Sequence, residues 1–298
     1  MYILEPAINS DAPRAVGLPV LAGEKEETLF ADARPAGNKG SFALRQAGRW
    51  LIGRASIAAP QGLEKATRAL YRELFAAAGD LHLCRVWHYV PRINENGIEG
   101  IENYRAFCQG RSKAFETKYG CGFEQRLPSA SAVGTEDNSL TVVFAACADE
   151  PRHVENPEQV SAYKYPKKHG PRPPSFSRAS VIPLVSGLSD VFISGTAAIQ
   201  GHESVAPGET AAQIESTLRN LRLISRACGL DADLGVARGG VRHLKIYIRR
   251  DEDLGQIKTA LEQTLLKPTD RVSYLRSDIC RAELMLEIEA TVLGVRVD

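Results

Sequence analysis

The chain has 298 residues, of which 44% are hydrophobic and 24% are charged, and its formal net charge at pH 7 is +1. This composition is that of a globular protein of one large domain or two ordinary ones, whose core needs no disulfide or metal for support. The near-zero net charge gives no reason to expect nucleic acid as a partner, and no apolar run is long enough to span a membrane.

The first half of the chain alternates between strand and helix. Its first 40 residues are rich in Pro, Gly and Ala and are expected to be irregular. They lack the basic region and apolar stretch of a signal peptide, so we expect a cytoplasmic protein. Further on, apolar residues recur at helical spacing or alternate as in strands. The expected strands are 50–57, 81–90 and 139–146, and the expected helices are 62–78 and 98–119.

The second half repeats this order of elements. A glycine at 229 is expected to close its first helix, and acidic residues are expected to cap the start of its second. The expected strands are 190–199, 241–249 and 282–297, and the expected helices are 210–228 and 251–266. With a shift of 142, three residues coincide: Gly53, Ala55 and Ile57 fall on Gly195, Ala197 and Ile199. Three identities are weak evidence alone, but the shared order of elements indicates an internal duplication.

This pattern predicts an α+β fold of two tandem halves, each a mixed sheet packed with helices. We assign residues 1–150 to the first half, 151–180 to a Pro-rich connector and 181–298 to the second half. The connector cannot be an α-helix, because Pro lacks the backbone N–H and restricts the residue before it. A stiff loop that carries Tyr and Arg at the junction of two halves is typical of a cleft wall that binds a planar anion.

Cysteine and histidine show no metal-binding or redox spacing. No CxxC, HxH or HExxH pattern occurs, so we expect no metal, reduced thiols and mostly small packed side chains. The six cysteines are Cys84, Cys108, Cys121, Cys147, Cys228 and Cys280.

Three blocks of the sequence resemble the chorismatases. They are NYRAFCQGRSKAF at 103–115, SAYKYPKKHGPRPPSFSRA at 161–179 and DICRAELMLEIEA at 278–290. The second half also resembles the RidA (YjgF) fold, through ISGTAAIQGH at 193–202 and LEIEA at 286–290. The resemblance implies two RidA/YjgF-like (chorismate mutase-like) halves, the first degenerate. It also implies an enzyme that splits chorismate into pyruvate and a hydroxylated ring acid, with no cofactor.

Chorismate is a dicarboxylate, and the planar fork of Arg matches a carboxylate in two hydrogen bonds. The resemblance assigns substrate binding to five residues: Tyr104, Arg111, Tyr163, Arg178 and Ala197. Tyr104 and Arg111 are seven residues apart and share one face of the expected helix, although a packing Tyr and a surface Arg would show the same spacing. The roles of Tyr165 and His169, in the same connector, stay open.

The resemblance makes Glu287 the catalytic acid. Alternation along the last strand points Met285, Glu287 and Glu289 to one face, where a Glu is costly unless it meets solvent, a partner or a pocket. An exposed edge-strand Glu would show the same pattern. Burial would raise the pKa of Glu287 and let it protonate the enolpyruvyl methylene.

Cys280 is the position that the resemblance links to the choice of product. A cysteine there accompanies hydroxybenzoate release, and a small residue accompanies a non-aromatic dihydrodiol. We therefore predict 3-hydroxybenzoate, with or without 4-hydroxybenzoate. A packed core thiol is the alternative reading of Cys280.

Three other functions stay open. One is a chorismate hydrolase that forms a 3,4-dihydroxycyclohexadiene carboxylate. Another is a RidA-type imine deaminase centred on Arg276 or Arg281, which the long Pro-rich insertion disfavours. The third is a non-catalytic sensor of aromatic acids. The tandem duplication favours a monomer.

Overall fold

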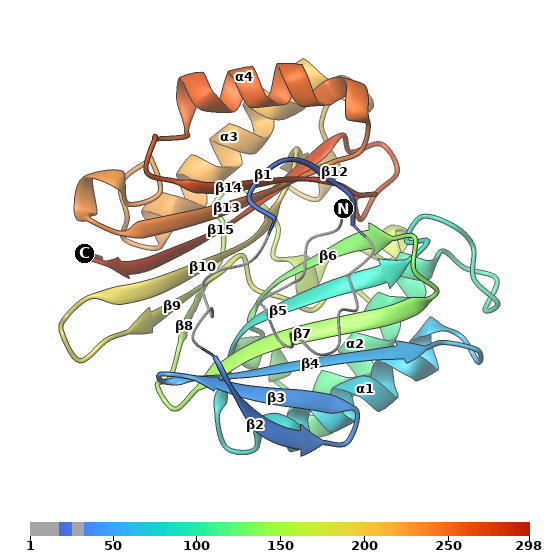
Figure 1. Ribbon diagram of the computed structural model, residues 1–298. Coiled ribbons are helices and arrows are strands. Elements are labelled where there is room, and N and C mark those ends of the chain that lie inside the picture. The colour runs from blue at the N-terminus through green and yellow to red at the C-terminus, as the bar shows by residue number, and fades with distance from the viewer. Residues whose placement is uncertain (1–17, 26–32) are drawn as a thin grey trace.

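Each half of the chain builds one mixed sheet with two helices on its outer side in the computed structural model, which describes residues 18–25 and 33–298 (Figure 1). The first half contains β2 (Arg34–Lys39), β3 (Phe42–Ala47), β4 (Trp50–Ala58), α1 (Leu63–Ala78), β5 (His82–Pro91), α2 (Asn103–Tyr119), β6 (Ser129–Thr135) and β7 (Ser139–Cys147). The second contains β8 (Arg152–Val154), β9 (Ala179–Pro183), β10 (Ser189–Thr196), α3 (Thr210–Ala227), β13 (Val241–Ile248), α4 (Leu254–Thr264), β14 (Arg271–Arg276) and β15 (Leu286–Val295). A small hairpin, β11 (Ile199–Gln200) and β12 (Glu203–Ser204), follows β10, and β1 (Val20–Gly23) joins the second sheet beside β14.

The two sheets share one topology. Their strand orders are β2-β3-β4-β7-β5-β6 and β1-β14-β13-β15-β10-β9-β8. In each, the strand before the first helix pairs antiparallel with the last strand, and the strands on either side of the second helix pair parallel. The predicted α+β class and the tandem arrangement are confirmed.

The inner faces of the sheets pack on each other, while their outer faces pack on the helices. Strand alternation makes this possible: Phe144 of β7 packs under the helices, and Val143 points to the layer between the sheets. The rings of Trp50 and Phe192 meet edge-on across that layer, with centroids 5.4 Å apart. Any polar site in the layer between the sheets is therefore surrounded by apolar side chains.

Several predicted boundaries were wrong. The helix predicted at 98–119 begins only at Asn103, and the last strand begins at Leu286 rather than at 282. Residues 251–253 form a 3-10 turn before α4, and no side chain caps that helix. β6 and β14 were not predicted. The irregular stretch predicted over the first 40 residues contains β1 and β2, and residues 1–17 and 26–32 of that stretch lie outside the described part of the chain.

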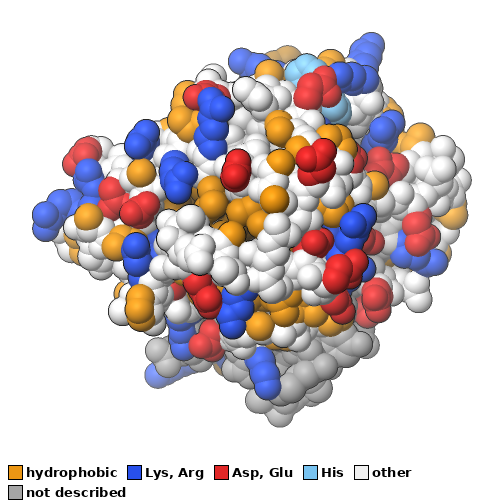
Figure 2. All heavy atoms as spheres, turned by 90° about the horizontal axis from the view of Figure 1, so that it is seen from above, with side chains coloured by type: hydrophobic (Ala, Val, Ile, Leu, Met, Phe, Trp, Pro, Cys, Tyr) orange, Lys and Arg blue, Asp and Glu red, His pale blue; other side chains and the backbone are white. Residues whose placement is uncertain are grey.

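The surface shows no segregation of charge on the face seen in Figure 2, where acidic and basic side chains are interspersed. Among the described helices, none is long and apolar enough to cross a membrane.

Candidate active site

A cavity of about 500 Å³ lies between the two halves. Its walls come from α2, the start of β6, the connector, the end of β10 and the segment that leads into β15. The lining residues with chemical potential are Tyr104, Cys108, Arg111, Ser131, Tyr165, His169, Arg178, Cys280, Arg281, Glu283 and Glu287.

Glu287 is a buried acid at the floor of this cavity, with 4% of its surface exposed. Leu286 and Ile288, its neighbours in β15, pack into the core of the second half, so Glu287 points into the layer between the sheets. Gly195 leaves it room, since a Cβ at that glycine would lie 1.8 Å from Glu287 Oε1. Burial, and secondarily the charge of Glu289, raises the pKa of Glu287 to about 8, although Arg85 and Arg178 oppose the rise. Glu287 is therefore a protonated acid at neutral pH.

Glu289, two residues on, has the opposite protonation state. Burial alone would raise its pKa, but the cations beside it lower the pKa below its usual value. Its carboxylate has four partners: Arg85 Nη2 at 2.7 Å, Trp87 Nε1 at 2.8 Å, Lys245 Nζ at 3.3 Å and Ser131 Oγ at 2.5 Å. Two carboxyl groups on one strand face are thus held in different states, which is how enzymes separate an acid from a carboxylate.

Arg111 of α2 is a buried cation without a counter-ion among the described residues. It is 2% exposed, its guanidinium stacks between the rings of Tyr71 and Phe115 at 5.5 and 5.6 Å, and its Nε and Nη2 have no hydrogen-bond partner within the described part of the chain. Burial lowers its pKa from the usual value. A desolvated guanidinium facing a cavity needs an anion to complete it.

Arg178 brings a second buried guanidinium to the cavity, at the last position before β9. Its backbone is anchored, because its carbonyl accepts a hydrogen bond from Ser194 N at 2.9 Å. Its Nη2 donates to Tyr165 Oη at 2.8 Å, and the guanidinium lies 5.1 Å from the centre of the Phe176 ring. The connector thus fixes the direction of Arg178.

A buried hydrogen-bonded pair supports Arg111 from behind. His88 Nδ1 lies 2.7 Å from the carbonyl oxygen of Ser131, and Tyr71 Oη lies 2.6 Å from His88 Nε2. Because a carbonyl only accepts, we assign the proton to Nδ1, so Nε2 accepts from the Tyr71 hydroxyl. This chain holds the Tyr71 ring in place against Arg111. Polar residues in an otherwise apolar strand were the only sign of this arrangement in the sequence.

The cavity brings together most of the predicted site residues. Tyr104, Arg111, Arg178, Ala197, Cys280 and Glu287 all line it. Tyr163 does not: its ring packs against the core of the first half, and Tyr165 faces the cavity instead. Burial, and then Glu287, raises the pKa of the Cys280 thiol, which stays protonated.

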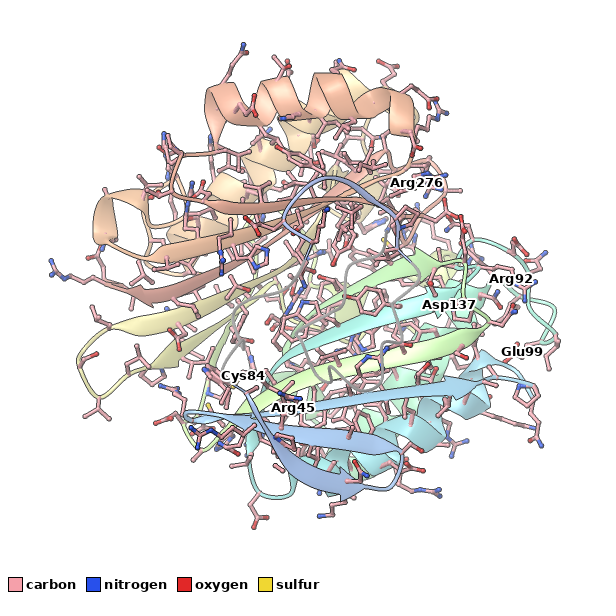
Figure 3. All side chains as sticks on the ribbon, viewed as in Figure 1. Arg45, Cys84, Arg92, Glu99, Asp137 and Arg276 are labelled. Atoms are coloured by element: carbon pink, nitrogen blue, oxygen red, sulfur yellow. The ribbon has the colours of Figure 1, made fainter. Side chains whose placement is uncertain are left out.

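The two arginines considered for a deaminase differ in position. Arg276 lies outside the cavity, at the end of β14, where it pairs with Asp251 at 3.3 Å (Figure 3). Arg281 lines the cavity, but its guanidinium donates to Ser204 Oγ and to the carbonyl of His202, both at 3.0 Å.

His169, which lines the cavity, is paired with a second histidine. His169 Nε2 lies 3.1 Å from His202 Nδ1. Together with Glu203 these histidines could offer three ligand atoms to a metal ion, and the three atoms lie within 4.8 Å of one another. Lys168 already pairs with Glu203, and the charge of Arg281 reaches His169. This cationic setting disfavours a metal ion there.

Comparison with known proteins agrees with this geometry. A family described as chorismatase FkbO/Hyg5-like, N-terminal, matches residues 28–146. A 3-hydroxybenzoate synthase of Streptomyces hygroscopicus is 36% identical over 241 residues, which cover 77% of this chain and 69% of that protein. A chorismatase of Streptomyces rapamycinicus is 34% identical over 285 residues, covering 90% and 84%. The chain belongs to the chorismatase family.

A solved chorismatase structure extends this assignment to three dimensions. It matches with a TM-score of 0.78 and 33% identity, and the match covers 87% of this chain and 80% of that one. The resemblance to chorismatases drawn from the sequence is thus confirmed. A YjgF-family protein from Neisseria meningitidis is a more distant match, with 21% identity, a TM-score of 0.32 and 42% of this chain covered.

Proposed function

We propose that this enzyme cleaves chorismate to pyruvate and a hydroxybenzoate, chiefly 3-hydroxybenzoate. One observation carries the proposal: a buried carboxyl group with a raised pKa shares one cavity with two buried guanidinium groups. In one of these, Arg111, two nitrogens have no hydrogen-bond partner among the described residues. Chorismate offers two carboxylates for the guanidinium groups and an enol ether for the acid. The family assignment supports the same reaction.

In the proposed mechanism, Arg111 and Arg178 bind the carboxylates and Glu287 donates its proton to the enolpyruvyl methylene carbon. That carbon becomes a methyl group, and positive charge develops at the ether carbon. The carboxylate left on Glu287, with Glu289 beside it, stabilises this charge. Attack by water or by a ring oxygen then leads to release of pyruvate.

Product identity separates the branches of this mechanism. Pyruvate and a hydroxybenzoate together have the composition of chorismate, so that branch consumes no net water, whereas the dihydrodiol branch consumes one water molecule. The decisive experiment incubates purified protein with chorismate, measures pyruvate by a coupled reduction and separates the ring products by chromatography. Absence of pyruvate would overturn the proposal. Tight binding of chorismate without turnover would instead indicate a sensor.

Cys280→Ala is expected to shift the ring product from 3-hydroxybenzoate to the dihydrodiol, with pyruvate release within about tenfold of wild type. The reason is that the Cys280 thiol lines the cavity beside Glu287 and would act on the ring after the methylene carbon is protonated. Cys121→Ala, at an exposed thiol, is the matched control. An unchanged ratio of products would show that Cys280 only fills space.

Gly195→Ala is expected to lower kcat by about 100-fold, because the new methyl group would occupy the position of the Glu287 carboxyl and displace it. Pyruvate release and circular dichroism would be measured together. Gly255→Ala is the control, since a Cβ there meets nothing within 4 Å. Full activity of the Gly195→Ala protein would show that the Glu287 carboxyl does not lie in the position assigned to it.

A further inference from the structure

Two cysteines meet where β5 and β7 pair, outside the residues that line the cavity. Cys84 lies in β5 where the register between Leu83 and Arg85 is irregular, and Cys147 is the last residue of the antiparallel β7. Their Sγ atoms are 3.6 Å apart, and both side chains face the layer between the sheets. Figure 3 shows Cys84 and Arg276 at opposite ends of this layer.

Arg49 polarises this pair. Its Nη2 lies 3.6 Å from Cys147 Sγ, and the same guanidinium pairs with Asp149 at 3.2 Å and donates to the Pro183 carbonyl at 2.9 Å. The hydrogen bond between the thiols, helped by Arg49, lowers the pKa of Cys147, and the same bond raises that of Cys84. Cys147 is thus the sulfur of the pair that loses its proton more readily.

Cys147 itself is fully buried, but the side chains beside its sulfur reach the solvent. The side chain of Arg49, which contacts its sulfur, is 23% exposed, and that of Asp149 is 43% exposed. A rotation of Arg49 would therefore open a path for a molecule not much larger than water. By contrast, burial raises the pKa of the Cys108 and Cys228 thiols to about 12, which leaves them unreactive.

We propose that Cys84 and Cys147 are a modification site that hydrogen peroxide converts to an intramolecular disulfide. The Cys147 thiolate attacks one peroxide oxygen, the O–O bond breaks, and the departing hydroxide takes a proton to become water. The Cys84 sulfur then attacks the Cys147 sulfenic acid: the S–S bond forms, the S–O bond breaks, and the leaving oxygen takes the Cys84 proton as a second water. The two sulfurs together lose two electrons, which reduce the peroxide.

The two sulfurs, which lie 3.6 Å apart, must come closer for the bond to form. A disulfide needs its sulfurs about 2.0 Å apart, so side-chain rotation on two neighbouring strands must close the remaining gap. The bond would tie the start of β5 to the end of β7 beside Arg49, whose contact with Pro183 joins the first half to the second. Its formation is measured without any assay of chorismate, and so is independent of the proposed function.

The test uses the full chain with Cys121→Ser, which removes the exposed thiol. After peroxide treatment the protein is unfolded, alkylated with N-ethylmaleimide and mapped by mass spectrometry. We expect a Cys84–Cys147 linked peptide and two fewer alkylated cysteines. Cys84→Ser is expected to stop at a Cys147 sulfenic acid, which dimedone traps. Arg49→Gln is expected to slow oxidation by about tenfold, and Cys228→Ser is expected to change nothing.

Two outcomes would overturn the proposal. One is oxidation of Cys108, Cys228 or Cys280 before any Cys84–Cys147 linkage appears. The other is a linkage that forms only in urea and not in the folded protein. If Cys84→Ser fails to fold, the peptide map of the Cys121→Ser protein still decides.

Discussion

Replacing Glu287 with glutamine is expected to lower kcat for pyruvate release from chorismate by about 1,000-fold. Glutamine matches the shape of a protonated carboxyl but cannot donate its proton to carbon. Because the native group is neutral near pH 7, the substitution leaves the charge of the cavity unchanged, and we expect KM to change by less than about threefold. Steady-state kinetics on wild type and variant would measure both constants.

The same residue sets a pH dependence. With a pKa of about 8, Glu287 is protonated below that pH and loses its proton above it, so kcat is expected to fall as pH rises through 8. Its pKa in the unfolded chain is lower, so between the two values the folded state binds the extra proton and stability declines as pH rises. Glu287→Gln removes this decline, and its stability gain over wild type should grow towards pH 8.

Glu262→Gln, at an exposed pair on α4, is the control for both readouts and should behave as wild type. The assignment fails if Glu287→Gln keeps more than about a tenth of wild-type kcat. It also fails if the fall in wild-type activity has its midpoint below pH 6, because an ordinary exposed carboxyl would then be titrating.

Arg111→Met is expected to lower kcat/KM by about 100-fold, mainly through KM, because a buried guanidinium that binds a carboxylate is lost. The thermal stability of the substrate-free protein, in contrast, should not fall. Methionine fills the space between Tyr71 and Phe115, and it removes a buried cation whose Nε and Nη2 have no partner among the described residues. We therefore expect an equal or higher Tm in the absence of substrate.

Arg111→Lys separates charge from geometry. Lysine keeps the positive charge but not the planar fork, so it should recover less than about a tenth of the lost kcat/KM. Arg68→Gln, at a half-exposed position on α1, is the control. Activity and Tm that fall together in Arg111→Met would mean that Arg111 holds the fold rather than the substrate.

Elements with a strong hydrophobic period could be predicted from the sequence, and elements without one could not. The strand at 241–248 alternates through Leu244 and Ile246, which both pack in the core of the second half. β6, by contrast, reads SASAVGT, and its small residues give no period. They are small for a reason: Ser131 must contact both the Glu289 carboxylate and Gly195 N in a crowded layer.

The site residues that lie in short sequence motifs could be predicted. Glu287 and the two arginines lie in recognisable sequence blocks. Arg85 and Glu289, by contrast, are 204 residues apart, and the sequence pattern of one strand does not predict an ion pair with a strand of the other half. Tyr163 and Tyr165 show a second limit. In a Pro-rich loop of 3-10 turns, side chains follow neither helical nor strand spacing, so the sequence could not tell which ring faces the cavity.

The ion pair between Arg85 and Glu289 joins the two sheets, and this makes the acid a property of the docked pair of halves. If the halves separated, water would reach Glu287 and its pKa would return towards that of an ordinary carboxyl. At neutral pH the loosened chain would carry a carboxylate where the docked chain carries an acid. An incompletely folded copy would therefore be unable to protonate the enol ether. The chain becomes an acid catalyst only when its two halves are docked.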